Sequence, residues 1–468
     1  MTDGHLTLRF AERLEKAVGD LKSLLGLRAT TTAAVRDHHS RGESHHPSAL
    51  PDVVCFPHTT EEVSDILKIS AAHDLPVIPF GAGTSLEGQV NAIHGGITID
   101  LCEMNKLVRV SAEDLDATVE AGITRLQLNK ALRDTGLTFA IDPGADCTIG
   151  GMAATRASGT TAVRYGTMAE NVLGLTVVLA DGRIIKTGTR ARKSAAGYDL
   201  TRLFVGSEGT LGIITEVTLK LHPLPEAVSA ASCAFEDIRG AVETVIETIQ
   251  LGVSIARIEL LDARQMDAVN RYSKTNYPVA PTLFFEFHGF NERHVNDQAA
   301  FVQSLAAARG GRDFQWATLQ EDREKLWEAR HAAYYASLAL RPGSKGLVSD
   351  ICVPISQLSE CIVEALKESV DSPFPATLVG HVGDGNFHMI YMIDPGSETE
   401  TSEAQRLVDQ MVARALAIGG TCTGEHGIGY GKMKYMSAEH GTAVDVMRAI
   451  KCALDPGNRM NPGKMIEP

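Results

Sequence analysis

Three glycine-rich segments within residues 81–215 constrain the fold more strongly than any other feature of the sequence. They are Gly81–Gly88, the paired runs Asp142–Ala154 and Ala157–Thr161, and Gly206–Thr215. β-like apolar runs adjoin them, and Val77–Phe80 leads directly into the first. Glycine lets a backbone turn tightly and approach a ligand closely. The recurrence therefore indicates backbone that wraps around a large planar cofactor, and it weakens the alternative of loops that are merely tight.

The first glycine-rich segment has the composition of a phosphate-binding loop. Successive backbone N–H groups and the hydroxyls of Thr84 and Ser85 suit a pyrophosphate. The spacing matches neither G-x-G-x-x-G nor the lysine-containing loop of NTP-hydrolysing enzymes, so neither Rossmann-type NAD binding nor NTP hydrolysis is supported. Taken alone, the loop fits an ordinary surface turn equally well.

A second candidate site lies in the run His381–His388. The dipeptide Asp384-Gly385 stands between two apolar runs and predicts a two-residue type I′ hairpin turn, which would place His381 opposite His388. Residues directly opposite on a hairpin have Cβ atoms roughly 4.5–5.5 Å apart. The two imidazoles would then reach one metal ion, with the carboxylate of Glu425 as a third ligand. Two ordinary strand histidines are the alternative.

Composition limits the class of protein. With 468 residues the chain is long enough for two or three domains, and its 44% apolar and 22% charged residues describe a soluble globular protein. The formal charge of −14 argues against nucleic acid as a partner. No apolar run approaches the ~20 residues of a spanning helix, and no signal-peptide core is present. We expect the cytoplasm, with the membrane periphery or an organelle matrix left open.

The order of the predicted elements indicates an α+β protein. We expect an N-terminal helix and loop over 1–45, a cofactor domain over 46–225, a substrate and metal domain over 226–430, and a C-terminal segment over 431–468. The eight cysteines are scattered without a C-x-x-C pair, so we expect reduced core residues and no disulfide framework.

Two further motifs support a family resemblance. They are Arg192-Lys193-Ser194-Ala195-Ala196-Gly197-Tyr198 and Gly420-Thr421-Cys422-Thr423-Gly424-Glu425-His426-Gly427. Together with the glycine-rich segments, they resemble the vanillyl-alcohol oxidase (p-cresol methylhydroxylase) family over Val53–Lys464. Within it the chain is most similar to the D-2-hydroxyacid dehydrogenases, in particular those of the cytochrome-linked D-lactate type. The resemblance implies a two-subdomain FAD-binding domain, a ferredoxin-like substrate (cap) domain and a C-terminal helical segment that returns to the flavin.

The resemblance also implies which residues hold the cofactor. Covalent members of the family attach the flavin to a histidine of the first glycine-rich loop, and this chain has none there, so we expect non-covalent FAD. The FAD contacts carried over are Pro79, Gly81, Ala82, Gly83, Thr84, Ser85, Gly88, Pro143, Gly144, Ala145, Gly150, Gly151, Ala154, Ser158, Gly159, Tyr165, Glu208, Gly212, Ile213 and Asn461.

The expected chemistry is oxidation of a small D-2-hydroxy acid to the 2-oxo acid, with hydride passing to flavin N5. A divalent metal, Zn or Mn, held by His381, His388 and Glu425 would lower the pKa of the substrate hydroxyl. The resemblance makes Arg330 the clamp for the substrate carboxylate. His426, next to a ligand, would accept the proton. A non-nicotinamide acceptor such as a cytochrome, a quinone or an electron-transfer flavoprotein would take the electrons.

Several alternatives stay open at this point. The relatives specific for D-2-hydroxyglutarate hold its distal carboxylate with a Thr and a Lys, and the matching positions here are Tyr334 and Val348, which favours a D-lactate-like substrate. A D-2-hydroxyglutarate dehydrogenase, or a glycolate oxidase FAD subunit without activity of its own, is the second choice. A zinc hydrolase is disfavoured because no H-E-x-x-H motif is present. A homodimer is one open arrangement.

Overall fold

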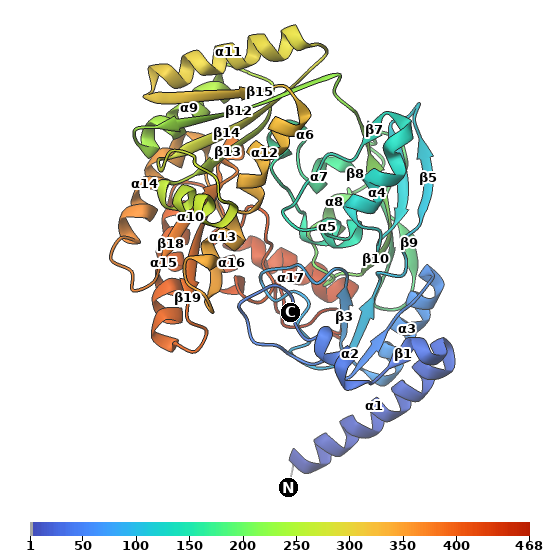
Figure 1. Ribbon diagram of the computed structural model, residues 1–468. Helices are drawn as coiled ribbons and strands as arrows, with labels where there is room; N and C mark the ends of the chain where they lie inside the picture. Colours follow the sequence, from blue (N-terminus) through green and yellow to red (C-terminus); the bar gives the residue numbers. More distant parts are fainter. Residues whose placement is uncertain (1–2) are drawn as a thin grey trace. The chain divides into compact units, whose positions relative to one another are not determined.

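The computed structural model describes residues 3–468 and divides them into two compact units (Figure 1). The first unit contains the residues up to 158, 167–223 and 425–468, and the second contains 159–166 and 224–424. The sequence placed the corresponding domain ends at 225 and 430. Both units combine helices with sheets, so the predicted α+β class is confirmed.

The first unit contains two main sheets. In the four-stranded sheet, β2, β4 and β3 are parallel and β1 pairs antiparallel at the edge; the five-stranded sheet is antiparallel throughout. In sheet order the strands are β1 (Ala29–Thr30), β2 (Val53–Cys55), β4 (Ile97–Asp100) and β3 (Val77–Phe80), then β5 (Leu107–Ser111), β6 (Asp116–Glu120), β10 (Ile213–Lys220), β8 (Val172–Val178) and β9 (Ile184–Lys186), with β11 (His222–Pro223) and β7 (Leu137–Thr138) as a separate pair.

Helices α1 and α3 build the core of the four-stranded sheet. Apolar residues of α1 at helical spacing, including Leu21 and Leu25, are buried against Val63 and Ile66 of α3. Helix α3 begins where Thr59 accepts a hydrogen bond from the backbone N–H of Glu62. The helices of this unit are α1 (Asp3–Leu25), α2 (Ala33–His38), α3 (Thr60–His73), α4 (Arg125–Leu132), α5 (Ile149–Thr155), α7 (Met168–Asn171), α8 (Leu200–Phe204), α16 (Met436–His440) and α17 (Ala443–Leu454).

The C-terminal segment is anchored within the first unit by a buried lysine. Lys451 of α17 donates to the carbonyls of Thr210 and Met460 and pairs with Asp455 at 2.5 Å. Met460 in turn forms a bridge with Val77 at the start of β3. A buried ammonium group is stable only with such partners, so the tail is fixed beside β3 and the third glycine-rich segment.

The second unit is organised around one antiparallel sheet of eight strands. Its order is β15 (Gly311–Ala317), β12 (Ala227–Phe235), β14 (Thr282–Gly289), β13 (Ile255–Leu261), β18 (Ala376–Gly380), β19 (Asn386–Ile393) and β16 (Lys345–Val348), with β17 (Ile351–Cys352) also paired to β19.

Helices cover both faces of this sheet (Figure 1). One group of helices consists of α10 (Ala263–Ser273), α12 (Gln320–His331) and α13 (Ala333–Ala339). The other group consists of α9 (Ile238–Gln250), α11 (Glu292–Ala308), α14 (Leu358–Glu368) and α15 (Glu398–Ala417). The short helix α6 (Ala162–Tyr165) packs near β13. Leu261 of β13 and Phe284 of β14 share an apolar cluster with Trp327 of α12. Since strand side chains alternate between faces, Glu259 and Glu286 point to the α12 side as well.

The predicted hairpin turn at Asp384-Gly385 is wrong. Val379, not His381, is the partner of His388, and residues 382–384 form a short 3-10 turn that ends at Gly385 with φ 81°. The loop is therefore longer than a two-residue turn, because Asp384 N–H and Asn386 N–H both donate to the carbonyl of His381. The two imidazoles remain neighbours, with ring centroids 5.5 Å apart at 83°.

Candidate functional site

The glycine-rich segments lie against one another in the first unit. A Cβ atom at Gly81 would lie 2.4 Å from Thr148 Oγ1, and one at Gly209 would lie 2.3 Å from Pro79 Cγ. Backbone hydrogen bonds from Gly206 and Glu208 to the carbonyls of residues 153 and 154 join the third segment to the second. Such close approaches require the absence of side chains, which explains the glycine content.

Two buried hydroxyls in these segments show that the loops fit a polar ligand. Among the residues that the structure describes, the Oγ atoms of Ser85 and Ser207 are buried without a hydrogen-bond partner. A buried hydroxyl without a partner costs free energy, so an additional polar group is expected beside it. The predicted FAD contacts around Gly81–Ser85 and Glu208 therefore converge in space and have the polar atoms that a phosphate-bearing cofactor needs.

The remaining predicted FAD contacts are distributed over both units. Asn461 donates to the backbone carbonyls of Gln89 and Glu208, which ties the C-terminal tail to the first and third glycine-rich segments. Gly159 and Tyr165 belong to the second unit, where the Tyr165 hydroxyl lies 2.8 Å from His288 Nδ1.

Glu208 organises the backbone that follows Glu425 and His426. Its two carboxylate oxygens accept the N–H groups of Ile428 and Gly429 at 2.6 and 2.8 Å, and its own φ is 51°. Burial raises the pKa of the Glu208 carboxyl to about 7, although these two N–H groups oppose the shift. The segment is thus held by a carboxyl group that titrates near neutral pH.

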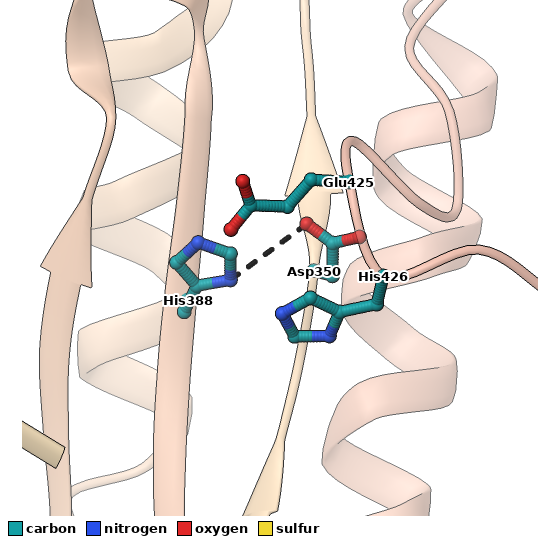
Figure 2. A group of neighbouring side chains, drawn as sticks. All are labelled: Asp350, His388, Glu425 and His426. Carbon is teal, nitrogen blue, oxygen red and sulfur yellow. Dashed lines mark ion pairs between the residues drawn. The ribbon is translucent and has the colours of Figure 1, made fainter. Parts of the chain in front are cut away.

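Four potential metal ligands lie together near strand β17, which is bridged through Cys352 to Thr421, just before the Thr423–His426 segment (Figure 2). Asp350, His388, Glu425 and His426 each offer one ligand atom, and these atoms lie within 4.8 Å of one another. His388 Nδ1 lies 2.9 Å from the carbonyl of Ser349 and 3.7 Å from Asp350 Oδ1. Of the sequence-predicted ligands this group contains His388 and Glu425 but not His381. It also contains His426, which the sequence predicted as the base, and Asp350, which sequence reasoning missed.

Asp350 is itself held by neighbouring side chains. Its Oδ1 accepts from Asn386 Nδ2 at 2.9 Å, and its Oδ2 accepts from Thr423 Oγ1 at 2.6 Å, while its backbone carbonyl accepts the N–H of Gly424. Hydrogen bonds therefore hold both carboxylate oxygens of Asp350 and orient the group beside His388.

Glu425 and His426 converge because their segment is a loop rather than a strand. Ser158 donates to Glu425 Oε2 at 3.0 Å, and Gln89 donates to the carbonyl of His426 at 2.8 Å. His426 Nδ1 lies 3.6 Å from Glu87, a buried residue of the first glycine-rich segment. Burial would raise the pKa of the Glu87 carboxyl, but Lys432 at 3.0 Å, with the nearby imidazoles, holds it well below its usual range.

His381 and Arg330 meet at a carboxylate that the sequence did not single out. Glu259, on β13, is fully buried; its Oε1 lies 2.8 Å from His381 Nδ1 and its Oε2 accepts from Arg330 Nε at 2.7 Å. Burial would raise the pKa of Glu259, but these two partners outweigh it and hold the pKa below its usual range. A charged residue inside the apolar strand Ile255–Leu261 is the sequence signal that would have found it.

The chain matches two family models over most of its length. Residues 51–188 match a family described as FAD binding domain, and residues 224–465 match FAD linked oxidases, C-terminal domain.

Individual relatives are similar over nearly the whole chain. "Probable D-lactate dehydrogenase, mitochondrial" of Danio rerio is 50% identical over 97% of this chain and 92% of its own length. "D-lactate dehydrogenase [cytochrome], mitochondrial" of Arabidopsis thaliana is 46% identical over 97% of this chain and 80% of its own. Among solved structures, p-cresol methylhydroxylase with substrate bound is similar at a TM-score of 0.80, with 19% identity over 97% of both chains, which supports the fold.

The titration of Glu208 generates a pH prediction. Because the pKa of Glu208 is raised in the folded protein to about 7 from an ordinary 4.5, the stabilising effect of protonation is complete below pH 4.5 and is lost as the pH rises through 7. The shift corresponds to on the order of 3 kcal/mol. We expect the stability difference between Glu208→Gln and the unmodified protein, from chemical denaturation, to change by up to this amount between pH 4.5 and 8. Parallel stability curves would show that Glu208 does not titrate in this range.

Proposed function

The chain belongs to the FAD-linked oxidases and, among them, to the D-lactate dehydrogenases, and we propose that it oxidises a small D-2-hydroxy acid of the D-lactate type with the help of a divalent metal. The family match excludes the zinc hydrolase alternative. The observation that carries the proposal is the chain's own site, where His381 and Arg330 share Glu259 and His388 lies with Glu425 and His426.

The flavin is proposed to bind non-covalently to the glycine-rich segments of the first unit. When bound, FAD supplies the hydride acceptor at N5. The N–H groups of Gly81–Ser85 and the hydroxyls of Ser85 and Ser207 would bind its polar groups, since these hydroxyls are buried and lack partners among the described residues.

His381, His388 and Glu425 are the proposed metal ligands. The Nδ1 atoms of the two histidines face acceptors, Glu259 Oε1 and the carbonyl of Ser349, at 2.8 and 2.9 Å. Donation from Nδ1–H fixes the tautomer that has its lone pair on Nε2, the form in which imidazole ligates Zn or Mn. The metal would polarise the substrate hydroxyl.

Arg330 is the proposed clamp for the substrate carboxylate. Its Nε is bound to Glu259, which fixes the plane of the guanidinium, and its terminal nitrogens form the pair that suits a carboxylate. His426 is proposed to accept the hydroxyl proton; its backbone carbonyl is held by Gln89, and the glycines that flank the Glu425-His426 pair allow the imidazole to turn toward the site.

The preference for a small substrate rests on an apolar cluster in the second unit. Tyr334 and Val348 pack against the buried side chains of Val379, Ile390 and Met392. A second carboxylate placed there would lose its hydration without meeting a cation, which costs several kcal/mol.

The electron acceptor is proposed to be a protein or quinone rather than a nicotinamide. The word cytochrome in the name of the Arabidopsis thaliana relative supports a cytochrome. Within residues 3–468, no helix combines the length and apolarity needed to span a membrane. The mitochondrial names of two relatives support an organelle matrix as the alternative to the expected cytoplasm.

Substrate preference is the experiment that tests this function. We expect a higher kcat/KM for D-lactate than for D-2-hydroxyglutarate in steady-state assays with an artificial electron-accepting dye. Val348→Lys should shift the ratio toward D-2-hydroxyglutarate by supplying a cation, whereas Val370→Lys, at a position that is 75% exposed, should not. A preference for D-2-hydroxyglutarate in the unmodified protein would overturn the assignment.

Flavin attachment is tested by acid precipitation, which we expect to release all flavin into the supernatant. Ser85→Ala should raise the Kd for FAD about 5-fold, the effect of roughly 1 kcal/mol for one hydrogen bond. Ser64→Ala is the matched control, because the Ser64 hydroxyl already donates to the carbonyl of Gly182. Flavin that stays in the pellet would contradict the non-covalent assignment.

Metal dependence is tested by chelation and by His388→Ala. Both are expected to abolish turnover and to leave the flavin absorbance spectrum intact, because the imidazole of His388 lies outside the glycine-rich segments. The measurements are metal content by elemental analysis and kcat after reconstitution. Full activity after verified metal removal would leave His381 and His388 with a structural role only.

The role of His426 predicts a large kinetic effect. His426→Ala should lower kcat by roughly 10²–10⁴-fold, the usual contribution of a positioned acid or base. Flavin and metal content should stay unchanged, and His440→Ala, a change in the surface helix α16, should have no effect. Near-normal flavin reduction by His426→Ala in single-turnover measurements would exclude it as the base.

A further inference from the structure

We infer that Glu259 is a positioning residue that couples metal binding to recognition of the substrate carboxylate. One carboxylate group holds both the imidazole of His381 and the guanidinium of Arg330. The inference rests on the proposed function, because that function assigns His381 to the metal and Arg330 to the substrate.

The geometry leaves Glu259 no spare oxygen. Its Oε1 is 2.8 Å from His381 Nδ1 and its Oε2 is 2.7 Å from Arg330 Nε, and the carboxylate is fully buried. The side chains of His381 and Arg330 are only 10% and 13% exposed. A buried carboxylate between two buried cationic or donor groups is rigid, since any rotation would leave one of the three without its partner.

Each contact has a separate chemical consequence. The contact with Nδ1–H of His381 sets the tautomer that presents the Nε2 lone pair to a metal. The contact with Nε of Arg330 sets the plane in which the two terminal nitrogens meet a carboxylate. A shift of Glu259 would therefore disturb both sites together.

An electrostatic role and a positioning role of Glu259 predict opposite changes in substrate binding. Glu259 carries the same charge as the substrate carboxylate, so a purely electrostatic role would mean that its neutralisation tightens substrate binding. A positioning role means that its neutralisation weakens substrate binding, because the guanidinium loses its fixed plane. The sign of the change in KM separates the two.

A glutamine at this position cannot replace the carboxylate. The amide has one acceptor oxygen and one NH₂ donor, whereas the site contains two N–H donors that face it. If the amide oxygen accepts from Arg330, the NH₂ group faces His381 Nδ1 and favours the tautomer that removes the lone pair from Nε2. The opposite orientation places two donors together at Arg330.

Glu286 offers a matched control on the same sheet face. It is also buried, also lies beside a histidine, with Oε1 2.8 Å from His288 Nε2, and also beside an arginine, with Oε2 3.6 Å from Arg257. Register pairs Glu286 of β14 with Arg257 of β13, two residues from Glu259. Loss of this carboxylate should cost comparable stability without touching a proposed metal ligand or Arg330.

The test uses the full-length protein with bound flavin and compares Glu259→Gln with Glu286→Gln. Titration of the metal-free protein with Zn²⁺ or Mn²⁺ should give a Kd that rises 10–100-fold in Glu259→Gln, the usual effect of losing a partner of a metal-bound histidine. At saturating metal, KM for D-lactate should also rise by about 10-fold, more than kcat falls. Glu286→Gln should change the metal Kd and KM by less than about 2-fold.

Either an unchanged metal Kd or a lower KM in Glu259→Gln would overturn the inference while leaving the proposed function intact. If Glu259→Gln does not fold, Glu259→Asp is the second variant. Its shortened carboxylate can reach only one of the two donors, so it should lose either metal affinity or D-lactate affinity, and retention of both would overturn the inference. Failure of the unmodified protein to bind a divalent metal or to oxidise D-lactate would refute the proposed function and the inference with it.

Discussion

The burial of charge on one face of the eight-stranded sheet is the constraint on which the rest of the second unit depends. Glu259 and Glu286 are buried carboxylates, and each would be strongly destabilising without a cation or donor beside it. Helix α12 supplies Arg330 to the first, and β13 supplies Arg257 to the second. The packing of α12 is therefore set by ion pairing as well as by the apolar contacts of Trp327. Such a face contributes little net stability, but its ion pairs fix the side chains in defined orientations.

The first unit solves a different problem, which is to bring three distant segments of backbone together. Side chains would prevent this approach, as the 2.4 Å separation between Thr148 Oγ1 and a Cβ atom at Gly81 shows. The glycine content of the sequence indicates this close approach of backbone, so the sequence predicted that the glycine-rich segments form one site. The sequence likewise predicted an N-terminal helix, and α1 spans Asp3–Leu25.

Side-chain partners that depend on tertiary structure could not be predicted in the same way. Turn propensity favoured a two-residue turn at Asp384-Gly385, but the carbonyl of His381 accepts two N–H groups and lengthens the loop. The observed partner of His388 is Val379, two residues from the predicted partner His381. A shift of two residues keeps the side chain of His388 on the predicted face of the sheet, and the two histidines remain neighbours. Glu259 and Asp350 have no local motif, because their partners are 122 and 73 residues away along the chain.

The distribution of the site between regular and irregular segments has a physical reason. His388 and Glu259 lie on strands, where the hydrogen bonds between neighbouring strands fix the Cα positions. A single side-chain hydrogen bond is then enough to select one rotamer. Adjacent residues on a strand point to opposite faces, so Glu425 and His426 could not both serve one site from a strand. A loop permits the two side chains to converge, but it has no regular hydrogen bonds to a neighbouring strand. The hydrogen bonds of Glu208, Gln89 and Asp350 to the backbone of residues 424–429 replace those regular hydrogen bonds, which is why buried polar side chains surround this segment.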